Sequence, residues 1–218
     1  PVTWLRWTAQ HALLRPAVWL LARPEVERRE KLDRLKGPVL VICNHVSDVD
    51  FAFVVAALPS SLGSRIAIAT AGEELEALRT PPSRSGFWHR IYGRMKWTLA
   101  VSLLNLFPLP RRAGFRESFA FAGDCVDRGS SILIFPEGGH TLDGKLKPFL
   151  VGIGVLANEL AIPIVPVRID GLFEAKRAGR RFVAPGQIGV KVGDPVIFTN
   201  RENPEKIAED LQRIVNSL

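Results

Sequence analysis

A histidine and an aspartate, His45 and Asp50, are the residues of this chain best placed by sequence to do chemistry. The apolar run 39–42 before them is typical of a buried strand, and the apolar run 51–58 after them suits a helix. In open α/β sheets, chemistry is carried by the loops that follow the strands. A carboxylate beside an imidazole fixes the ring's tautomer and stabilises the imidazolium that forms when the ring accepts a proton. The pair therefore predicts a general base. The structural alternative is a histidine at a strand end and an aspartate that begins a helix.

Apolar patterns along the rest of the chain alternate between strands and helices. Further strands are expected at residues 65–70, 132–135, 164–169 and 188–192, and residues 106–112 end a strand-like segment. Helices are expected at 3–22 with a break at Pro16, 72–78, 88–99, 115–126 with Gly129 closing it, 149–160, and from Asn203-Pro204 to the end. Segments 59–64 and 175–181 are expected to be loops, and 25–36 a charged helix or linker.

This alternation predicts an α/β fold with a mostly parallel central sheet flanked by helices. A length of 218 residues suits one such domain. We expect it to span residues 37–218 and to follow a helical membrane-interface segment, residues 1–36. The chain begins at Pro1 and not at Met, which indicates processing or a place within a longer protein.

Positive charge is concentrated in one part of the chain. Residues 77–116 contain no Asp or Glu but eight Lys or Arg, whereas the formal net charge of the whole chain is +7. All five tryptophans lie either in the first twenty residues or in this basic window. Trp beside Lys and Arg is typical of a membrane interface with anionic lipid. The alternative is that each Trp is buried in the core. In that case the apolar stripe of the expected 88–99 helix packs against the sheet.

Other classes of function have less support in the sequence. A divalent-metal hydrolase would use His45, Asp48 and Asp50 as ligands, but the remaining histidines are scattered without ligand spacing. The two cysteines also lack zinc-like spacing, so no metal or cofactor is predicted. A non-catalytic module that binds membranes is a further alternative. A nucleic-acid partner is not expected, because no DNA- or RNA-binding motif is present.

Four segments resemble, in order, the motifs of the lysophosphatidic acid and glycerol-phosphate acyltransferase superfamily. Residues 44–50 resemble its N-H-x-x-x-x-D motif, and Phe135-Pro136-Glu137-Gly138 its F-P-E-G motif. Residues 107–111 resemble its second motif, which ends in an arginine, and residues 162–167 its fourth. The chain departs from the pattern after F-P-E-G, where the family usually has Thr or Ser and then Arg. Gly139 and His140 stand there instead.

The resemblance implies transfer of a fatty acyl group from acyl-coenzyme A or acyl carrier protein to a lysophospholipid-like acceptor. In that reaction His45 would be the general base and Asp50 its partner. Arg111 and the amides of Gly138 and Gly139 would bind the acceptor phosphate, while Glu137 would shape the acceptor site. Ser47 lacks the surroundings of a nucleophilic serine, so direct attack by the acceptor is expected.

The distribution of Trp and of positive charge also predicts where in the cell the protein works. We expect a peripheral or monotopic protein on the cytoplasmic, anionic face of a membrane, because no segment of the sequence is long enough to cross a bilayer.

Overall fold

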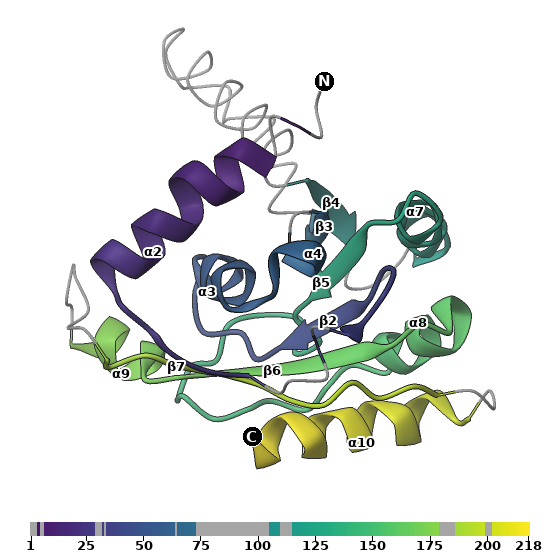
Figure 1. Ribbon diagram of the computed structural model, residues 1–218. Helices are drawn as coiled ribbons and strands as arrows, with labels where there is room; N and C mark the ends of the chain where they lie inside the picture. Colours follow the sequence, from purple (N-terminus) through teal and green to yellow (C-terminus); the bar gives the residue numbers. More distant parts are fainter. Residues whose placement is uncertain are drawn as a thin grey trace, which may run out of the picture.

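The computed structural model describes residues 4, 7–28, 32, 34–63, 65–72, 105–109, 115–178, 186–198 and 202–218. Three predicted features lie outside these residues: the 72–78 helix beyond Gly72, the 88–99 helix and Arg111. Within them the chain forms one sheet of seven strands with helices on both faces (Figure 1). The strands are β1 (Glu25–Arg28), β2 (Leu40–Cys43), β3 (Ile66–Ala71), β4 (Leu106–Leu109), β5 (Ser131–Ile134), β6 (Ile164–Asp170) and β7 (Gly189–Val192).

The sheet has the order β1-β7-β6-β2-β5-β3-β4. β6, β2, β5, β3 and β4 run parallel, whereas β7 is antiparallel to β6 and β1 is parallel to β7. All four residues of β2 and all four of β5 are buried, as expected for central strands covered on both faces. The predicted mostly parallel α/β sheet is therefore confirmed.

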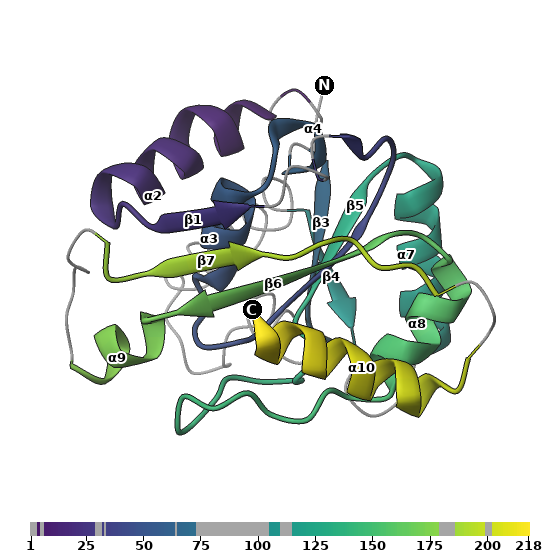
Figure 2. The same ribbon diagram turned by 60° about the horizontal axis from the view of Figure 1, so that its bottom comes forward.

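Two helical layers enclose this sheet (Figures 1 and 2). The helices are η1 (Ala9–Leu14, a π-helix), α2 (Arg15–Leu21), α3 (Asp50–Ala57), α4 (Ser60–Gly63), α7 (Phe115–Asp127), α8 (Gly152–Leu160), α9 (Leu172–Arg177) and α10 (Pro204–Ser217). α2 and α3 pack on one face, in a core that includes Val18, Val54 and Val165. α7, α8 and α10 pack on the other, around Ile132 and Leu211.

The helix boundaries follow the local signals in the sequence. Pro16 lies in the first turn of α2, where its missing N–H costs no hydrogen bond. The Oδ1 atom of Asn203 accepts a hydrogen bond of 2.9 Å from the N–H of Glu205 and so caps α10. Gly129 follows α7 with φ of +75°, a conformation that favours glycine. These predicted helix signals are confirmed.

Three local predictions were wrong. Residues 25–28 are a strand and not a helix or linker, so part of the expected 1–36 segment belongs to the central sheet. Glu25 and Glu27 are exposed and Val26 is half-buried, an alternation of too few residues to recognise in the sequence. Residues 60–63 of the expected 59–64 loop form a short helix, and residues 175–177 of the expected 175–181 loop belong to the helix 172–177. In α9, Leu172 and Ala175 are buried at helical spacing, which the neighbouring basic residues obscured.

None of the helices in the described ranges has the length and apolar character needed to cross a membrane.

Candidate active site

Two loops meet at one edge of the sheet because their strands are parallel neighbours. Ile42 of β2 lies opposite Ile134 of β5 in the ladder. Residues 44–50 follow β2 and residues 135–141 follow β5, so both loops leave the carboxyl ends of adjacent strands. The N-H-x-x-x-x-D and F-P-E-G segments, far apart in sequence, are thereby brought into contact.

The His45 ring is bonded to a buried carboxylate. Nδ1 of His45 lies 2.9 Å from Oδ2 of Asp50, and the Asp50 side chain is completely buried. Asp50 also accepts hydrogen bonds from the Val46 N–H at 2.6 Å, the Ser47 N–H at 2.9 Å and the Ser47 hydroxyl at 2.9 Å. Four donors around one carboxyl group suit an ionised Asp50, which only accepts, so Nδ1 donates. The second ring nitrogen, Nε2, is then left as a base.

The start of α3 gives Asp50 a favourable electrostatic position. Asp50 is the first residue of this helix, whose N-terminal end carries partial positive charge from unpaired N–H groups. The carboxylate reaches back to the loop before the helix and fixes that loop's shape. The same side chain therefore starts the helix, orders the loop and orients the imidazole.

The turn after β5 surrounds His45 from the other side. Oε1 of Glu137 accepts a 2.7 Å hydrogen bond from the His45 N–H, and the Thr141 N–H donates to the His45 carbonyl at 2.8 Å. The Phe135 ring stacks on the His45 ring at 4.3 Å between centroids and 19° between planes. The His140 ring meets it edge-on at 4.1 Å and 62°. Backbone and ring of His45 are thus both held by residues 135–141.

Glu137 is a buried carboxylate whose two oxygens both serve the backbone. Its Oε2 accepts a 2.8 Å hydrogen bond from the Lys147 N–H, and its side chain is 6% exposed. Burial raises the pKa of Glu137, while the hydrogen bonds from the Lys147 and His45 amides act in the opposite direction. Glu137 therefore joins the His45 loop to the loop that carries Lys147.

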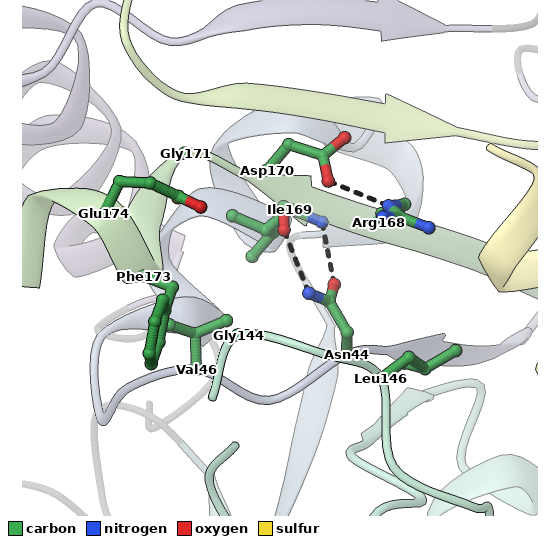
Figure 3. A pocket seen from close by; sticks show the side chains of 10 residues that line it. All are labelled: Asn44, Val46, Gly144, Leu146, Arg168, Ile169, Asp170, Gly171, Phe173 and Glu174. Carbon is green, nitrogen blue, oxygen red and sulfur yellow. Dashed lines mark hydrogen bonds and ion pairs between the residues drawn. The ribbon is translucent and has the colours of Figure 1, made fainter. Parts of the chain in front are cut away.

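Asn44 joins β2 to its other neighbour, β6. Its Nδ2 donates to the Ile169 carbonyl at 2.9 Å, and its Oδ1 accepts from the Ile169 N–H at 2.8 Å, as the dashed lines in Figure 3 show. Beside it lies a pocket of about 130 Å³, lined by Val46, Gly144 and the ion pair Arg168–Asp170 among others. Asn44 and Val46, the residues on either side of His45, therefore line a pocket at the same edge of the sheet.

Comparison with known proteins places this geometry in a family. A model of a family described as Acyltransferase matches residues 23–170, which include both loops of the site. The chain belongs to the Acyltransferase family. The match begins at Arg23, just before β1, in agreement with the place of that strand in the sheet.

Several relatives of this chain carry the same name. It is 26% identical over 207 residues to a 1-acyl-sn-glycerol-3-phosphate acyltransferase of Cocos nucifera, covering 94% of this chain and 59% of the relative. It is 33% identical over 118 residues to the Pseudomonas aeruginosa protein of that name, covering 52% and 45% respectively. The chain therefore spans less than two thirds of the length of these relatives.

A solved structure supports the fold of this chain. The 1-acyl-sn-glycerophosphate acyltransferase PlsC of Thermotoga maritima superposes with a TM-score of 0.62 at 22% identity, covering 97% of this chain and 79% of that one. The seven-stranded α/β sheet is thus a known architecture.

Two side chains of nucleophilic type near His45, Ser47 and Cys43, are hydrogen-bonded or buried. The Ser47 hydroxyl donates to Asp50 at 2.9 Å. Cys43 is completely buried; its burial, followed by the charges of Asp50 and Glu137, raises the pKa of the thiol well above its usual value. In the described part of the chain, no three His, Cys, Asp or Glu side chains are grouped so that they could hold a metal ion. This includes the set His45, Asp48 and Asp50.

The predicted site residues fall into three groups. His45, Asp50 and Glu137 are brought together by direct hydrogen bonds. Gly138 and Gly139 lie in the same turn, where Gly138 has φ of +68° and donates its N–H to the Phe135 carbonyl at 3.3 Å. Arg111 lies outside the described residues.

Sequence reasoning did not find the contacts of Phe135, His140 and Thr141 with His45. Phe135 and His140 were noted only as a motif letter and as a departure from the motif. No local signal indicates these contacts, because they depend on which strands are neighbours.

Substitution Glu137→Gln should weaken both folding and turnover. The glutamine offers one acceptor oxygen where two N–H groups need one each, so one buried N–H loses its partner. We expect the free energy of unfolding to fall by about 1–3 kcal/mol. We also expect kcat to fall, because the loop that carries His45 is held less firmly. Urea denaturation and steady-state assays measure the two effects.

Glu117→Gln on the exposed side of α7 is the matched control. An unchanged kcat in a Glu137→Gln protein would show that this tether does not position His45 for turnover.

Proposed function

We propose that this chain transfers a fatty acyl group from an acyl thioester to the hydroxyl of a lysophospholipid-like acceptor, such as 1-acyl-glycerol-3-phosphate. The donor would be acyl-coenzyme A or an acyl carrier protein. Family membership and the names of the relatives support this function. The observation that carries the mechanism is the 2.9 Å contact between His45 and a buried, fully hydrogen-bonded Asp50 at the sheet edge.

The geometry supports one direct displacement. Nε2 of His45 takes the proton of the acceptor hydroxyl as its oxygen attacks the thioester carbonyl carbon. The new C–O bond forms, the C–S bond breaks, and the thiolate leaves and recovers a proton. Asp50 stabilises the imidazolium that exists between these proton transfers. The engaged Ser47 hydroxyl and the buried Cys43 thiol support a route without an acyl-enzyme intermediate.

The acceptor site is proposed from the motif and the turn. Arg111 would contact the acceptor phosphate, since a guanidinium can form two hydrogen bonds with a phosphate. The amides of Gly138 and Gly139 would provide further donors beside His45. Glu137 would contribute by holding the turn in shape, because its carboxylate already accepts two backbone N–H groups.

Removing the imidazole should abolish most turnover. We expect His45→Ala to lower kcat by about 10²–10⁴-fold, the usual contribution of general-base catalysis. Asp50→Asn should have a smaller but clear effect, because its amide cannot accept all the hydrogen bonds that Asp50 accepts. Acyl transfer from acyl-coenzyme A to 1-acyl-glycerol-3-phosphate, followed by mass spectrometry, measures both.

The controls for this experiment are the unfolding temperature of each variant and Asp127→Asn, an exposed aspartate on α7. If a folded His45→Ala protein turns over at nearly the normal rate, the proposed mechanism is wrong.

Arg111→Ala should act on acceptor binding. Loss of a charged hydrogen bond to phosphate is expected to raise the KM for the phosphate-bearing acceptor by about ten- to a hundredfold, with little change in the donor KM. Arg116→Ala, an exposed arginine of the same basic window, is the matched control. A rise in the donor KM alone would assign Arg111 to the phosphates of the donor instead.

We propose that the protein works on the cytoplasmic, anionic surface of a membrane, where its amphiphilic substrates reside. The N-terminal helical segment exposes a group of large apolar side chains, as a surface that enters the headgroup region would. These are Trp4, Trp7, Leu13, Trp19, Leu20 and Leu21. The basic window, residues 77–116, would add electrostatic attraction to the same surface.

Vesicle binding should therefore have two components. Salt should weaken binding to anionic vesicles, since each cation near the surface contributes about 1 kcal/mol and is screened, but a salt-resistant part should remain. Trp19→Ser with Leu20→Ser should remove much of the salt-resistant part. Arg90→Glu, Arg94→Glu and Lys96→Glu together should remove the salt-sensitive part.

Ile197→Ser is the matched control, because Ile197 is 54% exposed and follows β7, outside the N-terminal segment. Co-sedimentation with vesicles measures all variants. Equal sedimentation of parent and both multiple variants would contradict a membrane contact through these segments.

A further inference from the structure

His140 lies against the proposed base, at the position where this chain departs from the resembled motif. Its ring centroid is 4.1 Å from that of His45, at an angle of 62° between planes. Its Nε2 lies 3.3 Å from Oδ1 of Asp48, a charge-pair distance without the geometry of a hydrogen bond. Its backbone carbonyl accepts a 2.9 Å hydrogen bond from Nζ of Lys147. The site therefore contains two imidazole–carboxylate pairs side by side, His45 with Asp50 and His140 with Asp48.

These contacts limit the freedom of the His45 ring. Asp50 holds Nδ1, Phe135 stacks on the ring at 19° between planes, and His140 meets it edge-on. Aromatic rings in such stacked and edge-to-face arrangements attract each other beyond the effect of buried area. A base held this way presents its remaining nitrogen in one direction, which favours reaction from a bound substrate.

The charge of His140 also affects His45. Burial is the main cause that lowers the pKa of His140, and the charge of His45 is the next. The other charged groups around His140 are Asp48 and Asp50, which raise its pKa, and Lys176, which lowers it; Lys147 bonds its carbonyl. The pKa of His140 is therefore lower than that of an ordinary histidine, so its ring gains a proton less readily as the medium is acidified. A charged His140 would oppose the positive charge that His45 acquires during proton transfer.

We propose that His140 is a positioning residue that holds the His45 ring against Phe135 and must be neutral for His45 to accept the acceptor's proton. This inference rests on the proposed function, since it requires His45 to be the base. It assigns a role to the residue that replaces the cation expected from the motif. Since His140 acts through His45, it need not touch either substrate.

Two substitutions of His140 separate shape from charge. His140→Ala removes the ring and should lower kcat by about two- to tenfold, the fold-change that corresponds to one aromatic pair, with both KM values unchanged. His140→Phe keeps a ring without a titratable group and should recover most of this loss. A similar rise in the acceptor KM in both variants would overturn the proposal, because it would make His140 an acceptor ligand.

The pH profile tests the requirement for a neutral ring. In the parent, log(kcat/KM) should fall on acidification with a slope greater than one, because protonation of either imidazole impairs the site. In His140→Phe the slope should be one, since His45 is then the only one of the two paired imidazoles that remains. Equal slopes in the two proteins would overturn the charge part of the proposal.

A double variant tells this inference apart from the proposed function. If His140 acts through His45, then His45→Ala with His140→Ala should be no slower than His45→Ala alone. Losses that multiply would overturn the inference while leaving His45 as the base. If His45→Ala alone keeps its turnover, the proposed function itself fails, whatever His140 does.

Discussion

Burial of the Asp50 carboxylate is the constraint on which the site depends. An ionised group removed from water is tolerated only when its oxygens are fully hydrogen-bonded. Here the Val46 and Ser47 amides, the Ser47 hydroxyl and the His45 ring supply the donors. The loop must therefore fold around the carboxylate, and the same folding fixes the direction of the imidazole. The conformation of the loop and the orientation of the His45 ring therefore have one cause.

The second carboxylate at the site has a different task. Glu137 is also buried, but it bonds backbone amides from two loops and no ring nitrogen. Asp50 orients the side chain of His45, while Glu137 and Thr141 hold its main chain. Asn44 does the same for the junction with β6. Several motif residues of this chain thus serve to hold the loop that carries His45.

Departures from sequence expectation occurred where short segments take their structure from distant partners. β1 was mistaken for a helix or linker because its four residues carry little apolar signal and become a strand by pairing with β7, far along the chain. α4 and α9 are too short for periodicity to predict. Longer elements such as α7 and α10 have clear stripes and caps, so their type and position were predicted correctly.

The sequence by itself determined the elements with strong local patterns, the mostly parallel sheet, and the His45–Asp50 pair, whose members share one short loop. It also indicated the family through its motifs. Only the tertiary structure decided that the turn at 135–141 surrounds His45, because this depends on β5 pairing beside β2. The hydrogen bond from the His45 N–H to Glu137 spans 92 residues of sequence. The edge-on contact of His140 likewise arises from strand order, since no local spacing relates it to His45.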